Sequence, residues 1–180
     1  MMILPDKWIL ENARKGLIKP FFKARVGKGI FSSGISSYGY DFVLADEFKI
    51  FTGKKPIDPK NPDPDSFIDF KGKICEIPPS CFVLGRSVEY FKIPRNVLGI
   101  CFGKSSYARS GIIAYVTPLE PEWEGQITVM IANITPVSNR VYAGEGICQV
   151  IFLKANSICK KSYADKKGKY QKSKGIIFSK

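Results

Sequence analysis

The fold is decided by Gly103 to Asn133, which read GKSSYARSGIIAYVTPLEPEWEGQITVMIAN. Residues 105–110, which follow a glycine and a lysine, predict a single helical turn between strands. Along residues 127–131, side chains that alternate across a strand put Thr128 and Met130 on one face and the other three residues on the opposite face. Taken by itself, Met130 is expected to be a strand residue that fills the interior of a β-barrel.

Outside this stretch, short runs with strand-like spacing dominate. Phe42, Leu44, Phe48 and Ile50 come in even steps, and residues 141–153 are rich in β-branched and aromatic side chains. Such runs, separated by turn residues, are typical of an all-β sandwich or barrel. No internal repeat, coiled coil or linker divides the chain, so the 180 residues predict a single domain with one core.

Two segments depart from the strand pattern. The N-terminus predicts one short helix, with Asp6 as its N-cap residue, Ile9 and Ala13 at helical spacing, and Gly16 as its C-cap. Residues 53–66, GKKPIDPKNPDPDS, are dense in proline, aspartate and lysine, and they predict a surface loop.

The absence of histidine excludes several kinds of active site. A Ser-His or Cys-His nucleophile pair and an HExxH metalloenzyme both need histidine. The common zinc deaminase needs an HxE motif together with PCxxC. Any deamination by this chain would therefore have to activate water without zinc.

The cysteines and the apolar runs indicate in which cellular compartment the protein is expected. Five cysteines at irregular spacings, with no CxxC pair, favour buried free thiols over a disulfide framework. The longest apolar runs are too short to span a bilayer, and the start MMILPDKW lacks the pattern of a secretory signal. The expected location is the cytoplasm.

The formal net charge of +12 favours polyanionic partners, either nucleotides or nucleic acid. Positive charge is concentrated in residues 160–180, which hold eight lysines and a single acid, Asp165. Composition leaves two interpretations open for this segment: a solvated tail, or a part of a binding site.

The segment Gly103 to Arg109 predicts an anion site. A glycine before a short helical turn lets backbone N–H groups and two hydroxyls point outward, and Lys104 and Arg109 add positive charge there. This combination suits a triphosphate, although the GxxxxGK[ST] spacing of a P-loop is absent. The alternative is an ordinary solvent-exposed turn.

Several blocks of the chain resemble the dCTP deaminase family, cytosine-nucleotide deaminases that are related in fold to dUTPases. Residues 103–109 are similar to the family's GKSTYAR or GRSSLAR block, and residues 115–125 to its VTPLEPEWEG turn. Residues 35–41 resemble its SSYGYD block, residues 85–91 its ARTVEYF block, and the matches run to about residue 175. The resemblance implies a mainly β fold: a distorted jelly-roll β-barrel of the dUTPase-like type, with a short N-terminal helix and one or two helical turns.

The same resemblance implies a function and an assembly. The implied activity is hydrolysis of dCTP to dUTP and ammonia, without zinc and with Mg²⁺ carried by the triphosphate. dTTP is an implied regulator. The family resemblance also implies a homotrimer with sites between subunits, in which the basic tail, roughly residues 160–180, of one chain closes over its neighbour as a lid.

Individual site residues follow from the matched positions. Ser105 and Arg109 are expected to help place the base and the attacking water. The implied nucleotide-binding positions are Lys104, Ser105, Ser106, Tyr107, Ala108, Arg109, Thr128, Val129, Gln149, Tyr163, Lys169 and Ser173. Ser173 stands where the family has a glutamine, which shortens one contact.

Met130 departs from the family pattern at a position that matters for the chemistry. The family's ITLE or ITIE segment has its general base, a glutamate, at this position. Methionine has no titratable proton, and losing a general base costs roughly 10²–10⁴ in rate. The nearby Glu120, Glu122 and Glu124 match family positions outside the role of the base.

Four functional hypotheses follow. The first is a dCTP deaminase, and the second is a nucleotide-binding protein without turnover, in which nothing activates water. The third is a basic β-barrel that binds nucleic acid, although the chain lacks a stripe of basic residues interleaved with aromatics. The fourth is dUTP pyrophosphatase activity, with Glu120 near the place where an acid would be needed.

Overall fold

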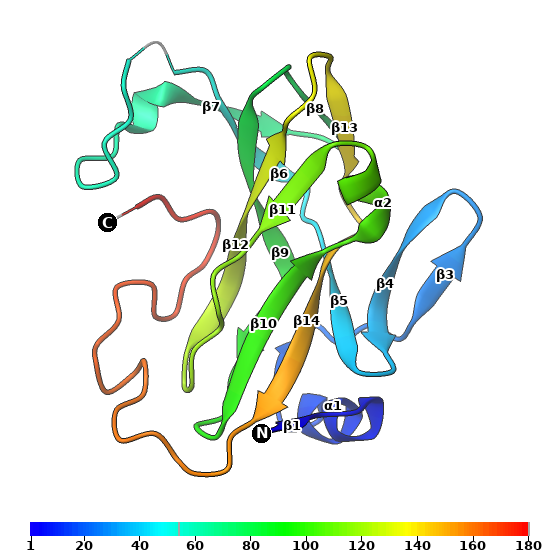
Figure 1. The fold of residues 1–180 in the computed structure, drawn as a ribbon, viewed down its shortest axis with the longest axis vertical. Helices are drawn as coiled ribbons and strands as arrows, with labels where there is room; N and C mark the ends of the chain where they lie inside the picture. The colour runs from blue at the N-terminus through cyan, green and yellow to red at the C-terminus, as the bar shows by residue number, and fades with distance from the viewer. Residues whose placement is uncertain (54, 180) are drawn as a thin grey trace.

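The computed structural model describes residues 1–53 and 55–179. Lys54, in the predicted surface loop, and Lys180, in the predicted lid, lie outside the described residues. The predicted mainly β barrel is confirmed, since two six-stranded antiparallel sheets face each other and curl around one core (Figure 1).

The first sheet has β14 near its centre. Its order is β1, β14, β5, β4 and β3, with β10 also paired to β14. The bounds are β1 (Met2–Ile3), β3 (Arg25–Gly27), β4 (Ile30–Ser36), β5 (Gly39–Val43), β10 (Val97–Gly103) and β14 (Gly146–Lys154).

The second sheet has β9 and β12 at its centre. Its order is β11, β12, β9, β6 and β7, with β2 also paired to β9. The bounds are β2 (Ile18–Lys19), β6 (Glu47–Phe51), β7 (Phe67–Lys71), β9 (Phe82–Lys92), β11 (Ile112–Tyr115) and β12 (Glu124–Asn133). A separate pair joins β8 (Ile74–Ile77) to β13 (Asn139–Tyr142).

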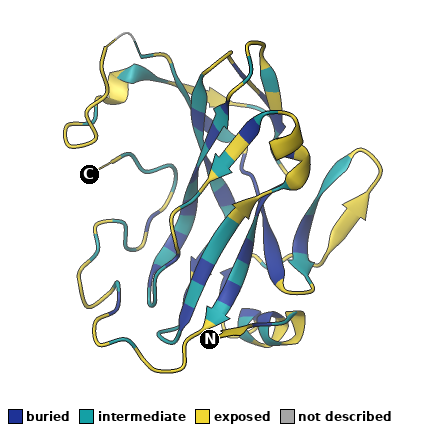
Figure 2. Ribbon diagram, in the orientation of Figure 1, coloured by how far each residue is buried: buried dark blue, intermediate teal, exposed yellow. Residues whose placement is uncertain are grey.

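Strict alternation of burial along β12 and β9 makes these strands the wall between the core and the outer face. On β12 every odd-numbered residue from Gly125 to Asn133 is buried, and every even-numbered one is half-buried. This confirms the predicted alternation, because Thr128 and Met130 share one face. Figure 2 shows buried and half-buried segments alternating along strands of the barrel. The idea that Met130 fills the barrel interior is wrong, because Val129 and Ile131 occupy that side.

In residues 1–53 and 55–179 the helical segments are few, as predicted. They are α1 (Asp6–Ala13), α2 (Ser105–Arg109) and a single 3-10 turn (Pro64–Ser66) at the end of the proline-rich loop. Among the described residues, no helix is long and apolar enough to cross a membrane.

Both predicted caps of α1 are displaced. Pro5, in extended conformation, is the N-cap, and Asp6 is the first helical residue. The helix also ends earlier, with Arg14 as its C-cap. Gly16 follows with a φ of +96°, and its N–H donates to Ala13 O at 2.9 Å, so it turns the chain just beyond the helix.

A buried carboxyl group, Glu89, joins the two sheets. It lies on the inner face of β9 with no exposed surface. The N–H of Val43 and the hydroxyl of Tyr40, both on β5 of the other sheet, donate to its oxygens at 3.1 and 3.0 Å. Burial raises the pKa of Glu89 to about 7. The surrounding core is apolar and aromatic, with Phe91 and Phe42 in edge-to-face contact.

The five cysteines are free thiols. Cys75 and Cys148 are buried, and the other three are half-buried. Burial raises the pKa of the Cys75 thiol to about 12, so this sulfur is an inert core atom at neutral pH.

Candidate functional site

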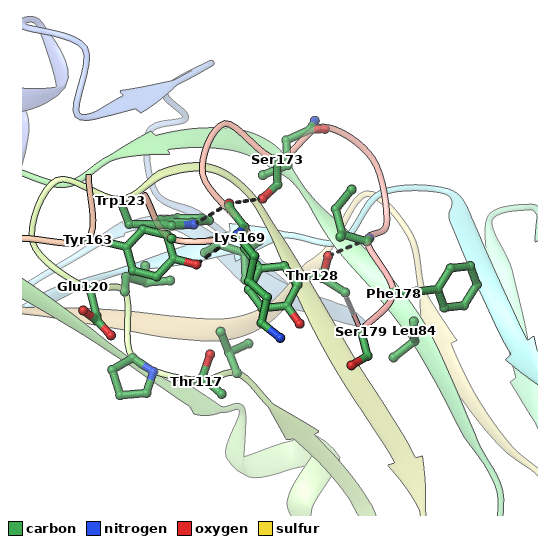
Figure 3. Close-up of a pocket in the computed structure, with 18 residues that line it drawn as sticks. Leu84, Thr117, Glu120, Trp123, Thr128, Tyr163, Lys169, Ser173, Phe178 and Ser179 are labelled. Atoms are coloured by element: carbon green, nitrogen blue, oxygen red, sulfur yellow. Dashed lines mark hydrogen bonds between the residues drawn. The ribbon is translucent and has the colours of Figure 1, made fainter. Parts of the chain in front are cut away.

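A cavity of about 670 Å³ lies between the outer face of the second sheet and the C-terminal tail, residues 155–179 (Figure 3). This volume is in the usual range for small-molecule sites. Four of the sequence-predicted nucleotide-binding residues line the cavity: Thr128 from β12, and Tyr163, Lys169 and Ser173 from the tail. Figure 3 shows their side chains gathered around the same space.

The tail docks on β12 of its own chain. The N–H of Lys172 donates to Glu124 O at 2.8 Å, and the N–H of Gln126 donates to Ser173 O at 2.9 Å. These bonds accompany a parallel bridge between Gly125 and Ser173, so the tail extends the sheet for a short distance. Within the one chain that the structure describes, backbone bonds thus tie the tail to its own strand β12.

Beyond Ser173 the tail is held by side chains of β12 instead of backbone groups. Gly175 N donates to Gln126 Oε1 at 2.8 Å, and Ile177 N donates to Thr128 Oγ1 at 3.1 Å. Gln126 and Thr128 can do this because strand alternation directs both toward the tail. The Thr128 hydroxyl is therefore an acceptor for the tail as well as part of the cavity wall.

The end of the tail is anchored by an aromatic contact. The ring of Phe178 lies 4.9 Å from that of Phe67 on β7, and Lys49 Nζ lies 5.1 Å from its centroid. The hydroxyl of Ser179 donates to Pro59 O at 2.6 Å, in the proline-rich loop. The loop that the sequence marks as irregular surface thus contacts the closing segment of the cavity.

Tyr163 organises the part of the tail that carries Lys169. Its N–H donates to Pro121 O at 2.9 Å, and its hydroxyl accepts from Tyr170 N at 3.0 Å. The ring packs so closely on Gly168 that an added Cβ would lie 2.2 Å from it. Tyr163 therefore stabilises the conformation of the tail and also lines the cavity.

Met130 lies beside this cavity without lining it. It is half-buried on the same face of β12 as Thr128, and its Cα partner on β9 is Leu84, which does line the cavity. Val129 has no exposed surface and points into the core, so its side chain is not available to a ligand.

The predicted anion segment forms α2 at the end of β10. Ser105, Ser106, Ala108 and Arg109 are exposed. Tyr107 differs, because only 2% of it is exposed. Its ring stacks on Phe31 with centroids 4.2 Å apart, and burial raises the pKa of its hydroxyl. Tyr107 fastens α2 to the barrel, and its side chain is not directed at a ligand.

Lys104 is committed to an internal ion pair. Its Nζ lies 2.7 Å from Asp41 Oδ2 and 2.8 Å from Ser32 Oγ, with 14% of the side chain exposed. The second carboxylate oxygen of Asp41 accepts from Gln149 Nε2 at 3.2 Å. Asp41 thus brings together two predicted binding residues, and the positive charge expected at the start of α2 is partly neutralised.

The predicted residues therefore form two groups within one chain. In one group, Lys104 and Gln149 meet at Asp41 on the first sheet, and residues 105–109 continue from Lys104 into α2. None of these residues lines the cavity on the second sheet. In Figure 1, α2 and the tail lie on different sides of β10 and β11.

Sequence reasoning assigned no role to four residues that shape these groups. Asp41 belongs to the quoted SSYGYD block, and that match was its only signal. Trp123 donates from Nε1 to Tyr170 O at 3.0 Å. Gln126 and Phe178 hold the tail through contacts across about 50 and 110 residues of sequence, respectively, which no local pattern reveals.

A family model described as dCTP deaminase-like matches residues 3–155. A dCTP deaminase of Granulibacter bethesdensis is 57% identical over 98% of this chain and 97% of its own length. A dCTP deaminase of Campylobacter hominis is 56% identical over 98% of this chain and 94% of its own length. A dCTP deaminase of Acidobacterium capsulatum is 53% identical over 100% of both chains.

Among solved structures, 2'-deoxycytidine 5'-triphosphate deaminase from Agrobacterium tumefaciens superposes with a TM-score of 0.64 over 83% of this chain. At 15% identity this likeness shows the fold alone. The present chain spans 47% of that longer chain.

Proposed function

Because the chain belongs to the dCTP deaminase-like family, we propose that it hydrolyses dCTP to dUTP and ammonia. The observation that carries the proposal is the 57% identity to a dCTP deaminase over nearly the full length of both chains. The cavity of about 670 Å³, with Lys169 and Tyr163 in its wall, is a suitable size for a nucleotide. Similarity over the whole chain gives no support to the alternative that the protein only binds nucleotides.

In the proposed reaction water adds to C4 of the cytosine ring and ammonia leaves from the same carbon. The water must lose a proton, and the departing amine must gain one. We assign Ser105 and Arg109 to placing the base and the water, a role that their exposure on α2 permits. Arg109 also suits the triphosphate, because a guanidinium binds phosphate oxygens in a fork.

Met130 is proposed to lower the rate of this reaction. It occupies the family position of the general base, beside the cavity wall formed by Thr128 and Leu84. A carboxylate there could accept the proton of the attacking water, whereas a thioether cannot. A Met130→Glu variant should therefore release ammonia faster from dCTP, by a factor of roughly 10²–10⁴.

The test follows ammonia release from dCTP with Mg²⁺ for the wild type, Met130→Glu and a matched Met130→Gln variant. Glutamine has the shape of glutamate without its titratable proton, so it should leave the rate near that of the wild type. Release of ammonia by the wild type supports the proposed activity. Equal rates for all three proteins would contradict the role assigned to position 130.

We further propose a homotrimer with sites between subunits. The separation of the α2 group from the tail group supports this, because a second copy could bring the two halves together. Exposed apolar side chains on β10 and β11 also support self-association, namely Phe102, Ile113 and Tyr115, each 47–58% exposed.

Subunit mixing tests this arrangement. Arg109→Ala removes a charge from the α2 group, and Lys169→Ala removes one from the tail group. If each site takes one group from each of two chains, dissociated and reassembled mixtures of the two variants should regain activity that neither has alone. A monomer by light scattering, or no recovery in an assembly proved to be mixed, would refute the shared site.

The remaining parts of the proposal concern small molecules and location. The substrate is the Mg²⁺ complex of dCTP, in which the phosphate oxygens hold the ion. dTTP is proposed as a regulator that competes for the same cavity, which a dTTP titration of ammonia release would test. The cytoplasm, where free nucleotides are available, is the proposed location.

A further inference from the structure

The single acid of the lysine-rich tail, Asp165, forms an ion pair with Arg95 of the barrel. Its Oδ2 accepts from Arg95 Nη2 at 2.7 Å and from the N–H of Ser162 at 3.0 Å. In return, the N–H of Asp165 donates to Ser162 Oγ at 3.2 Å. Ser162 has no exposed surface, so this turn is fixed at its base as well as by the ion pair.

Arg95 links this turn to the barrel. It lies in the loop between β9 and β10, and its other terminal nitrogen, Nη1, donates to Glu122 Oε2 at 2.5 Å. Glu122 belongs to the turn that leads into β12 and has a φ of +61°. One guanidinium therefore holds a carboxylate of the barrel and a carboxylate of the tail at the same time, as its planar fork allows.

The turn held in this way contains Tyr163. Between Ser162 and Asp165 the chain places the Tyr163 ring in the cavity wall, and the Tyr163 hydroxyl then accepts from Tyr170 N. Lys169 precedes Tyr170 and lines the same cavity. Arg95 itself does not line the cavity, so any effect on a nucleotide must act through Tyr163 and the residues that follow it.

We infer that Arg95 and Asp165 are positioning residues that hold Tyr163 in the wall of the nucleotide cavity. This inference rests on the proposed function for the identity of the ligand, but the ordering of the tail is independent of it. Breaking the pair frees the turn, so a nucleotide must order the tail on binding and binds more weakly.

The experiment compares Asp165→Asn, Arg95→Met and Arg95→Lys with the wild type. Asp165→Asn is a conservative change at an exposed site and should fold normally. For dCTP turnover, the first two variants should raise KM about tenfold and leave kcat within about twofold. Arg95→Lys should lie between them and the wild type, because one ammonium cannot hold the two carboxylates through separate nitrogens.

Lys92→Met is the matched control. Lys92 also lies near a glutamate, with 4.0 Å between its Nζ and Oε2 of Glu124, the first residue of β12. Lys92 is not among the partners given above for the turn from Ser162 to Asp165. This variant loses the same charge as Arg95→Met and should change neither kinetic constant.

Two further readouts report the tail directly. Trp123 donates to Tyr170 O and is 8% exposed, so its emission should shift to the red when the tail loosens. A Trp8→Phe background leaves Trp123 as the only tryptophan. Trypsin should also cleave the tail lysines faster in Asp165→Asn than in the control.

A red shift, faster cleavage and a raised KM together support the inference. It is overturned if Asp165→Asn leaves emission, cleavage and KM unchanged, or if the tail loosens while KM stays the same. Absence of dCTP turnover in every protein would refute the proposed function alone. In that case the weakening of dCTP binding, measured by calorimetry, decides the positioning role.

Discussion

Replacement of Glu89 by glutamine should remove most of the pH dependence of stability between pH 5 and 8. The carboxyl group lies in the core with no exposed surface, and burial raises its pKa from 4.5 to about 7. The folded protein therefore holds this proton more tightly than the unfolded chain. The resulting stabilisation is complete below about pH 4.5 and is lost as the pH rises through about 7.

The size of the effect follows from the shift in pKa. A change from 4.5 to about 7, at roughly 1.4 kcal/mol per unit, corresponds to about 3 kcal/mol. The free energy of unfolding should therefore be lower for the wild type at pH 8 than at pH 5 by about this amount, relative to Glu89→Gln. Because the chain has no histidine, few other groups titrate in this range.

Urea unfolding at half-unit steps from pH 5 to pH 8, at one fixed protein concentration, measures both proteins. The fixed concentration matters because self-association would shift the apparent stability. The difference between the two proteins should change by about 3 kcal/mol over the series. Parallel curves would refute the reasoning, since they would mean that the carboxyl group titrates equally in the folded and unfolded chains.

Three other substitutions test separate features. Lys104→Met should lower the free energy of unfolding by about 3 kcal/mol, because it leaves the carboxylate of Asp41 buried without its partner. A higher KM with unchanged stability would contradict this and would indicate that Lys104 binds the phosphates of the nucleotide instead. Gly168→Ala puts a Cβ 2.2 Å from the Tyr163 ring and should cost about 1–3 kcal/mol in the docking of the tail, seen as faster tryptic cleavage. Phe178→Ala should speed the same cleavage without lowering the urea midpoint, because the contact holds only the end of the tail.

The parts of the structure that follow from local periodicity were predictable from the sequence. The alternation along β12, the short helix near residues 6–13 and the helical turn at Ser105 all follow from spacing between neighbours. The predicted cap positions of α1 were wrong: the N-cap is Pro5, one residue before Asp6, and the C-cap is Arg14, two residues before Gly16.

The site was only partly predictable because its geometry depends on contacts between distant residues. Lys104 matched a phosphate-binding block, but its partner Asp41 lies 63 residues away in the sequence. Tyr107 is the aromatic residue of a short turn, which could have indicated that it faces the core. The docking of the tail on β12 gave no local signal, since Gln126 and Thr128 bind backbone groups 49 residues distant.

The two ends of the docked tail should respond to dissolved salts in opposite directions. The ion pairs of Arg95 at its start are partly exposed, so dissolved sodium chloride weakens them by screening. The packing of Phe178 on Phe67 at its end is apolar, and sulfate strengthens contacts of that kind. Sodium chloride should therefore loosen the tail from its start, whereas ammonium sulfate should also strengthen the apolar contact at its end.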